Sequence, residues 1–219
     1  MINAALFDFD GTLLNTDTVH LACWNKCLSV YGTSLDDSFY SRHCSGYLTI
    51  DIAEKIIKTK PQVSTSIKAL AQEKESHYQE WIASKKIPSM PGVREVLIFL
   101  RDRKIRIGIV TGAPLSAIVK PLHDNELFDF FQIMVTREDV NRGKPAPDGY
   151  ILGLKKLGTE GRFAVSFEDT QLGVLAARSA KMHTFAIPNI YTALHDFSLA
   201  DHLCTDMLNA KDILSRILI

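Results

Sequence analysis

The hydrophobic pattern of the chain begins with a short apolar run, from Ala4 to Phe9, which Gly11 ends. A run of this length, closed by a turn residue, predicts a buried strand. Further strand-like runs lie near residues 105, 132, 163 and 183, and helical spacing of apolar positions fills the intervals between them. Regular alternation of helix and strand predicts an α/β fold with a parallel sheet and helices on both of its faces.

One part of the chain departs from this alternation and contains only helical patterns. Residues 17–31 predict a helix that ends at Gly32, and residues 49–59 predict a second helix that ends before Pro61. A third is predicted from a cap at Ser64 to about Lys85.

Proline and glycine in the segment 88–92 then interrupt the chain. The alternation resumes with a helix from about residue 93 and closes with a helix from about residue 209. We therefore expect a core made of residues 1–15 and 88–219, interrupted by a helical insert of residues 16–87.

Composition narrows the class of protein. With 219 residues and 46% hydrophobic positions, the chain can bury the core of one large domain, or of one domain and an insert. Its formal net charge of zero gives no global field that would favour nucleic acid or an anionic membrane. No apolar stretch reaches the ~20 residues of a membrane span, and no charged leader precedes an apolar run. We expect a cytoplasmic protein, monomeric or weakly dimeric, with free thiols at Cys23, Cys27, Cys44 and Cys204.

Asp8 and Asp10 are the first chemically informative residues, because they lie at the end of the first apolar run. Two residues apart on a strand, they point to the same side, where their charges repel unless a cation lies between them. A hard divalent cation is the simplest partner. The alternative is a solvated surface turn. An EF-hand loop is excluded, because its fifth and twelfth positions would be Thr12 and Val19.

Three further segments carry polar residues just after predicted strands or in a rigid loop. Thr111-Gly112 ends the run near 105, Lys144 lies in Gly-Lys-Pro-Ala-Pro-Asp, and Glu168-Asp169 ends the run near 163. Each alone also has an ordinary interpretation, as a strand end, an exposed loop lysine or helix-terminal charges. Lys144 is not a Walker lysine, because Pro145 stands where Ser or Thr is needed.

Together, in this order, the four segments resemble the motifs of the haloacid dehalogenase-like hydrolases, beginning with Asp-Phe-Asp-Gly-Thr-Leu at residues 8–13. The resemblance implies a Rossmann-like core with a small helical cap domain inserted after the first strand. It also implies a ligand crevice outside the carboxyl ends of the strands.

The resemblance assigns roles to the matching residues. Asp8 would be the nucleophile that accepts the phosphoryl group, and Asp10 the general acid and base. Thr111 and Lys144 would complete the catalytic set by contacting and neutralising the phosphate. A Mg²⁺ ion would be bound by Asp8, Glu168, Asp169 and the backbone carbonyl of Asp10.

Within the family, the chain resembles the branch of β-phosphoglucomutase, phosphoglycolate phosphatase and small sugar-phosphate phosphatases. The predicted substrate contacts are Gly11, Gly112, His20, Gly46 and Lys74. Lys74 has a second interpretation, in which its methylenes lie along a buried apolar seam and its amine reaches water.

Two departures from the mutase concern its second phosphate. Thr49 stands where the mutase carries a cap arginine, and Ala113-Pro114-Leu115 replaces a polar, basic stretch. We therefore favour a phosphatase of a small phosphorylated metabolite over a phosphoglucomutase-type phosphotransferase.

Three other interpretations remain open at this stage. A catalytically silent binding protein on the same scaffold would have no need of the complete motif set. A dehalogenase would lack Asp10. His20, Cys23 and Cys27 lie on one predicted helix face with soft-metal spacing, although buried free cysteine is common.

Overall fold

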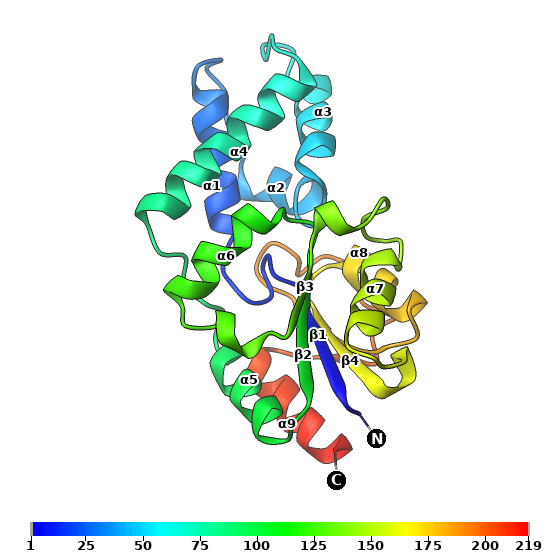
Figure 1. Cartoon of the computed structure of the whole chain (residues 1–219). Coiled ribbons are helices and arrows are strands. Elements are labelled where there is room, and N and C mark those ends of the chain that lie inside the picture. Colours follow the sequence, from blue (N-terminus) through cyan, green and yellow to red (C-terminus); the bar gives the residue numbers. More distant parts are fainter. Residues whose placement is uncertain (1, 219) are drawn as a thin grey trace.

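The six strands of the computed structural model, which describes residues 2–218, form one sheet in the order β3-β2-β1-β4-β5-β6, and all neighbouring pairs are parallel (Figure 1). The strands are β1 (Ala4–Phe7), β2 (Arg106–Val110), β3 (Ile133–Val135), β4 (Ala164–Glu168), β5 (His183–Ala186) and β6 (His202–Leu203). The predicted parallel α/β sheet is confirmed. The two-residue β6 was not predicted, because so short an edge strand leaves no periodic signal.

Helices cover both faces of the sheet, as predicted. Side chains alternate along a strand, so Ala5 and Phe7 of β1 pack on one face with α5 (Val93–Asp102), α6 (Leu115–Asp124) and α9 (Met207–Ile217). Ala4 and Leu6 pack on the other face with α7 (Asp148–Lys156) and α8 (Gln171–Ser179). Short 3₁₀ helices complete the core at η1 (Phe128–Phe130), η2 (Arg137–Asp139) and η3 (Gly161–Phe163).

The register of the central strands aligns the polar residues that follow them. Phe7 of β1 lies opposite Ile109 of β2 and Phe167 of β4. The residues that follow, Asp8 and Glu168 among them, therefore emerge side by side at the carboxyl edge of the sheet. This edge is where ligands of open parallel sheets bind.

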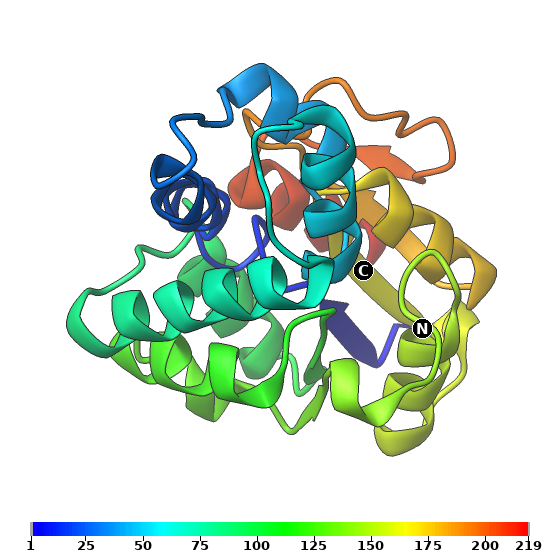
Figure 2. The ribbon, with the colours of Figure 1, turned by 90° about the horizontal axis from the view of Figure 1, so that it is seen from above.

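Four helices follow β1 and lie beyond this carboxyl edge (Figures 1 and 2). They are α1 (Asp17–Ser29), α2 (Asp37–His43), α3 (Thr49–Thr59) and α4 (Ile67–Ser84). A second apolar cluster holds them together, with Trp24, Leu28, Ile56 and Leu70 fully buried. We continue to assign residues 16–87 to a cap domain and the rest to the core as a proposal; Met1 and Ile219 lie outside the described range.

The helix boundaries differ from prediction in several places; helix α1, for example, ends at Ser29 and not at residue 31. Helix α4 is capped by Ser66, whose hydroxyl accepts the Ala69 N–H, and not by Ser64. Both serines satisfy the sequence rule for a cap, so sequence alone does not choose between them. Helix α2 was not predicted; its seven residues are too few for a clear periodic pattern, although Asp36 caps it by accepting the Phe39 N–H.

Two general expectations can be compared with this fold. All four cysteines are free and buried, as predicted. Among the described residues, no helix combines the length and the apolar character needed to cross a membrane.

Candidate active site

A pocket of about 1010 Å³ lies between the carboxyl edge of the sheet and helices α1–α4. Its lining includes most of the predicted catalytic and substrate-binding residues, from both parts of the chain: Asp8, Asp10, His20, Gly46, Lys74, Gly112 and Lys144. Residues separated by more than a hundred positions are thus brought to one cavity. The remaining predicted residues, Gly11, Thr111, Glu168 and Asp169, lie outside the wall of this pocket.

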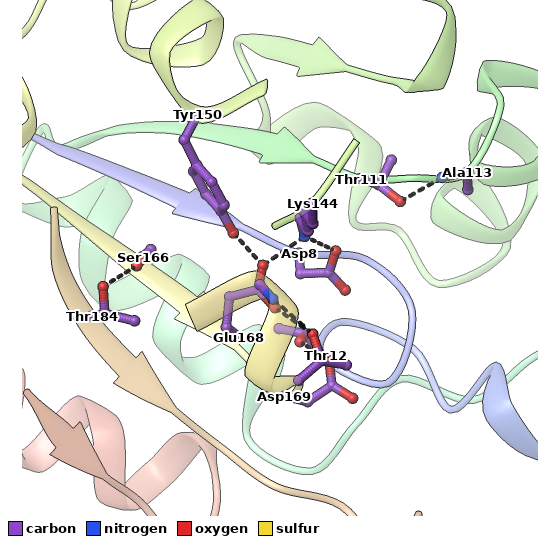
Figure 3. A network of polar contacts seen from close by, with 12 residues as sticks. Asp8, Thr12, Thr111, Ala113, Lys144, Tyr150, Ser166, Glu168, Asp169 and Thr184 are labelled. Carbon is purple, nitrogen blue, oxygen red and sulfur yellow. Dashed lines mark hydrogen bonds and ion pairs between the residues drawn. The ribbon is translucent and has the colours of Figure 1, made fainter. Parts of the chain in front are cut away.

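Lys144 supplies positive charge at the carboxyl edge of the sheet (Figure 3). Its ammonium forms ion pairs with Asp8 and, at 2.5 Å, with Glu168 Oε1. Tyr150 also donates its hydroxyl to Glu168. Burial works against a charged lysine, but the two carboxylates outweigh that effect and raise the pKa of Lys144.

Asp8, Glu168 and Asp169 form a cluster of buried carboxylates, and one oxygen from each lies within 4.8 Å of the others. Burial, and then the negative charge of Glu168 and Asp10, raise the pKa of Asp8 to about 8 although Lys144 opposes them. Burial and the neighbouring Asp17 and Asp8 raise the pKa of Asp169 well above its usual value.

Besides burial, both shifts reflect surplus negative charge, which Lys144 alone does not balance. An all-oxygen donor set with surplus negative charge fits a hard divalent cation such as Mg²⁺. The Asp10 carboxylate is not part of the cluster. A metal contact from Asp10 would therefore come from its backbone carbonyl, which is what the family resemblance implies.

Asp10 instead faces the helical side of the pocket. Its Oδ1 lies 3.1 Å from Nε2 of His20 on α1. Burial alone would raise the pKa of Asp10, but the hydrogen bond from His20 and the charge of Lys74 lower it overall. Burial and the Lys74 ammonium lower the pKa of His20, so a neutral imidazole faces an ionised carboxylate near neutral pH.

Lys74 is 6% exposed and lies on α4. Its ammonium is 5.9 Å from the Trp24 ring centre and 5.4 Å from that of Tyr78, and no ion pair of the described residues includes it. Of the two interpretations of Lys74, the structure favours the one in which its amine faces the pocket.

The predicted glycines and threonine differ in their surroundings. Gly46 has a positive φ of +84° and packs against Thr170. Thr111 accepts the Ala113 N–H at 3.0 Å and lines a smaller cavity of about 90 Å³ together with Gly112 and Lys144. A Cβ on Gly11 would collide with the side chains of Asp169, Asn189 and Asp17, so close packing at this position needs glycine.

Sequence reasoning missed a second polar group beneath the cluster, built around Asn189 in the loop after β5. The Asn189 amide nitrogen donates to Asp169 Oδ2 and to Asp17 Oδ2, each at 3.0 Å, while its oxygen accepts the Tyr191 N–H. Asp17 also accepts the hydroxyl of Tyr40 on α2. Asp17 and Asn189 are 172 positions apart, and neither belongs to a motif, so no local signal indicated that they meet.

Comparison with known proteins identifies the family of the chain. Residues 5–187 match the family model described as haloacid dehalogenase-like hydrolase. The chain is 29% identical to protein CbbY of Rhodobacter capsulatus over 216 residues, which cover 94% of each chain. It is 28% identical to a phosphorylated carbohydrates phosphatase of Thermotoga maritima, over 90% of this chain and 88% of that one.

Solved structures show the same fold. The crystal structure of CbbY from Rhodobacter sphaeroides in complex with phosphate matches with a TM-score of 0.85 and 24% identity, over 94% of this chain and 95% of that chain. Since the family model covers most of the sequence, the chain belongs to the haloacid dehalogenase-like hydrolases.

Proposed function

We propose that this hydrolase releases inorganic phosphate from a small phosphorylated metabolite, most favourably a sugar or polyol phosphate, and that it needs Mg²⁺. The observation that carries the proposal is the position of Asp8. Its carboxylate lines the pocket, pairs with Lys144 and belongs to the only all-carboxylate metal-binding group found among the described residues. Relatives with 28–29% identity over nearly the whole chain include a phosphatase of phosphorylated carbohydrates.

In the first step, a carboxylate oxygen of Asp8 attacks phosphorus and the bond from phosphorus to the leaving oxygen breaks. That oxygen takes a proton from Asp10, which faces the same pocket. Although Asp10 has a lowered pKa in the free protein, the negative charge of an arriving phosphate raises that pKa and favours the protonated form.

In the second step, Asp10 accepts a proton from water as the water attacks the aspartyl-phosphate, and the bond to Asp8 breaks. Inorganic phosphate leaves, and both carboxylates return to their starting state. Lys144 holds Asp8 by its ion pair and supplies positive charge to the phosphate.

Asp8 and Asp169 would hold the Mg²⁺, with Glu168 oriented beside them by Lys144 and Tyr150. When bound, the ion would neutralise charge on the phosphoryl oxygens.

The pocket contains little positive charge for a second phosphate. Lys144 is paired with carboxylates, and Arg137 is paired with Glu75 at 3.1 Å. Part of the pocket wall is uncharged and is formed by Thr49, Ala113 and Pro114. Among the described residues that line the pocket, Lys74 is then the lysine or arginine that forms no ion pair, which suits a substrate with one phosphate and a hydroxyl-rich remainder. This distribution supports a phosphatase over a phosphoglucomutase-type transferase.

The test is phosphate release from a panel of phosphorylated sugars, polyols and short acids, including β-glucose 1-phosphate, with Mg²⁺ and with excess chelator. We expect release from at least one sugar or polyol phosphate, lost in chelator and restored by Mg²⁺. Full release in chelator would refute the metal requirement. Absence of release across the panel would favour a silent binding protein.

A further inference from the structure

Beside the active-site pocket, but outside its lining, helices α1 and α4 bring together three side chains of metal-binding type. The Cys27 sulfur, a Glu73 carboxylate oxygen and a His77 ring nitrogen all lie within 4.8 Å of one another. Cys27 comes from α1, whereas Glu73 and His77 are four residues apart on α4 and so share one face of that helix. The two helices lie side by side in Figure 1.

The histidine of this cluster is already oriented. Nδ1 of His77 lies 3.2 Å from Oε2 of Glu80, and Nε2 lies 3.9 Å from Oε1 of Glu73. Glu80 is itself held by Lys26, whose ammonium donates to it at 2.9 Å. A histidine that binds a metal ordinarily gives its other N–H to a carboxylate. His77 has this arrangement, with Nε2 left to face Glu73 and Cys27.

The burial and the charge of these three side chains are also typical of a small metal site. Cys27 is fully buried at the inner end, while the side chains of His77 and Glu73 are 17% and 41% exposed. The site is therefore open to solvent on one side, where a water molecule can supply a further ligand. Among the ion pairs of the described residues, Glu73 has no lysine or arginine partner, and Lys26 is engaged by Glu80.

We propose that Cys27, Glu73 and His77 bind a borderline divalent cation such as Zn²⁺ and thereby tie α1 to α4. Sulfur, nitrogen and oxygen donors together are typical of Zn²⁺. Bonds of about 2.0–2.3 Å to one tetrahedral ion need donors about 3.5 Å apart, which small side-chain rotations reach from the observed spacing. The ion replaces the thiol proton of Cys27, which leaves to solvent.

In the metal-free protein the surroundings of the thiol oppose this exchange, and the cation has to offset them. Burial, and next the negative charge of Glu73, raise the pKa of Cys27 to about 12, so without a metal the sulfur keeps its proton. A cation between Cys27 and Glu73 removes the unfavourable interaction between thiolate and carboxylate. The site also replaces the earlier grouping of His20, Cys23 and Cys27, since His20 faces Asp10 and the partners of Cys27 come from α4.

The site would have a structural effect on the pocket. Helix α1 carries His20, and helix α4 carries Lys74, so a cation that joins the helices fixes the spacing of two pocket residues. The proposal does not depend on the phosphatase reaction.

The experiment adds Co²⁺, a spectroscopic substitute for Zn²⁺, to the metal-stripped full chain with Mg²⁺ in excess. A cobalt–thiolate charge-transfer band reports a cysteine ligand and so excludes the Asp8 cluster, which contains only oxygen ligands; its loss in a Cys27 variant assigns it to this site. The variants are Cys27→Ser and His77→Gln. The matched control is Cys23→Ser, since Cys23 is equally buried one turn earlier on α1 but outside the cluster.

We expect the wild type and Cys23→Ser to bind one Co²⁺ with the thiolate band, and Zn²⁺ to displace it and raise the melting temperature. His77→Gln should weaken Zn²⁺ binding by more than about tenfold, and Cys27→Ser should lose the band. Because His77 is partly exposed, its variant tests the site even if Cys27→Ser fails to fold. Absence of the band in the wild type, or its loss in Cys23→Ser alone, would overturn the proposal.

Discussion

Nε2 of His20 lies 3.1 Å from Oδ1 of Asp10 at the boundary between helix α1 and the sheet edge. The imidazole also stacks on Tyr78 of α4, with ring centres 4.6 Å apart. A residue of the helical segment therefore determines the orientation of the proposed acid and base. The position of Asp10 depends on the helices that cover the pocket, as well as on the strand that precedes it.

Replacement of His20 by alanine should lower kcat by about 100-fold, because a carboxylate that loses its orienting partner moves away from the leaving oxygen. The measurement is steady-state phosphate release with the best substrate of the panel. His43→Ala, a histidine change on α2 outside the pocket lining, is the control and should change kcat little. Equal activity of His20→Ala and the wild type would show that Asp10 needs no support from α1.

Replacement of Asn189 by alanine should weaken Mg²⁺ binding by about 10–100-fold, because the amide orients the Asp169 carboxylate through a 3.0 Å hydrogen bond. It also leaves Asp17 and Asp169 without the donor that lies between them. The Mg²⁺ concentration for half-maximal phosphate release measures the effect, and the Mg²⁺-dependent rise in melting temperature measures it independently of turnover.

The control for this change is Asn125→Ala. Asn125 is also half-buried and donates its amide to two backbone carbonyls, but it lies outside the active site. Both variants should lose some stability, whereas only Asn189→Ala should shift the Mg²⁺ dependence. The same Mg²⁺ requirement in both would leave Asn189 with a purely structural role.

Incubation with β-glucose 1-phosphate should give free phosphate and little glucose 6-phosphate, if this sugar is accepted. The uncharged wall at Thr49 and Ala113 offers no cation to a second phosphate, and a hydrogen bond to a charged group contributes roughly 1.5–3 kcal/mol. Phosphorus NMR follows both products, with and without a trace of glucose 1,6-bisphosphate. Rapid isomerisation that depends on the bisphosphate would instead support the mutase.

The sequence predicted those site residues that belong to short motifs at the ends of strands. Asp8, Asp10 and Lys144 belong to short segments whose strand ends must meet at one sheet edge, so their convergence followed from the parallel fold. The limits of α3, Thr49–Thr59, were also predicted, and its end is set by Pro61, which follows closely.

Contacts between distant loops and helix faces were beyond prediction. Asn189 lies in an irregular loop, and its meeting with Asp17 depends on how that loop returns across the sheet edge. The grouping of Cys27 with His77 likewise depends on the rotation of two packed helices about their axes. Hydrophobic spacing predicts which face of a helix is buried, but it does not specify which residues of two helices lie opposite each other.

The most direct test of the central claim is to identify the phosphorylated residue. Wild-type protein mixed with Mg²⁺ and a good substrate is quenched in acid within a turnover, and its peptides are analysed by mass spectrometry. The account predicts phosphate on Asp8, together with a fall in kcat of about 10³-fold or more in a folded Asp8→Asn variant, whose amide cannot attack phosphorus. Phosphate on another residue, or near-normal turnover by Asp8→Asn, would contradict it.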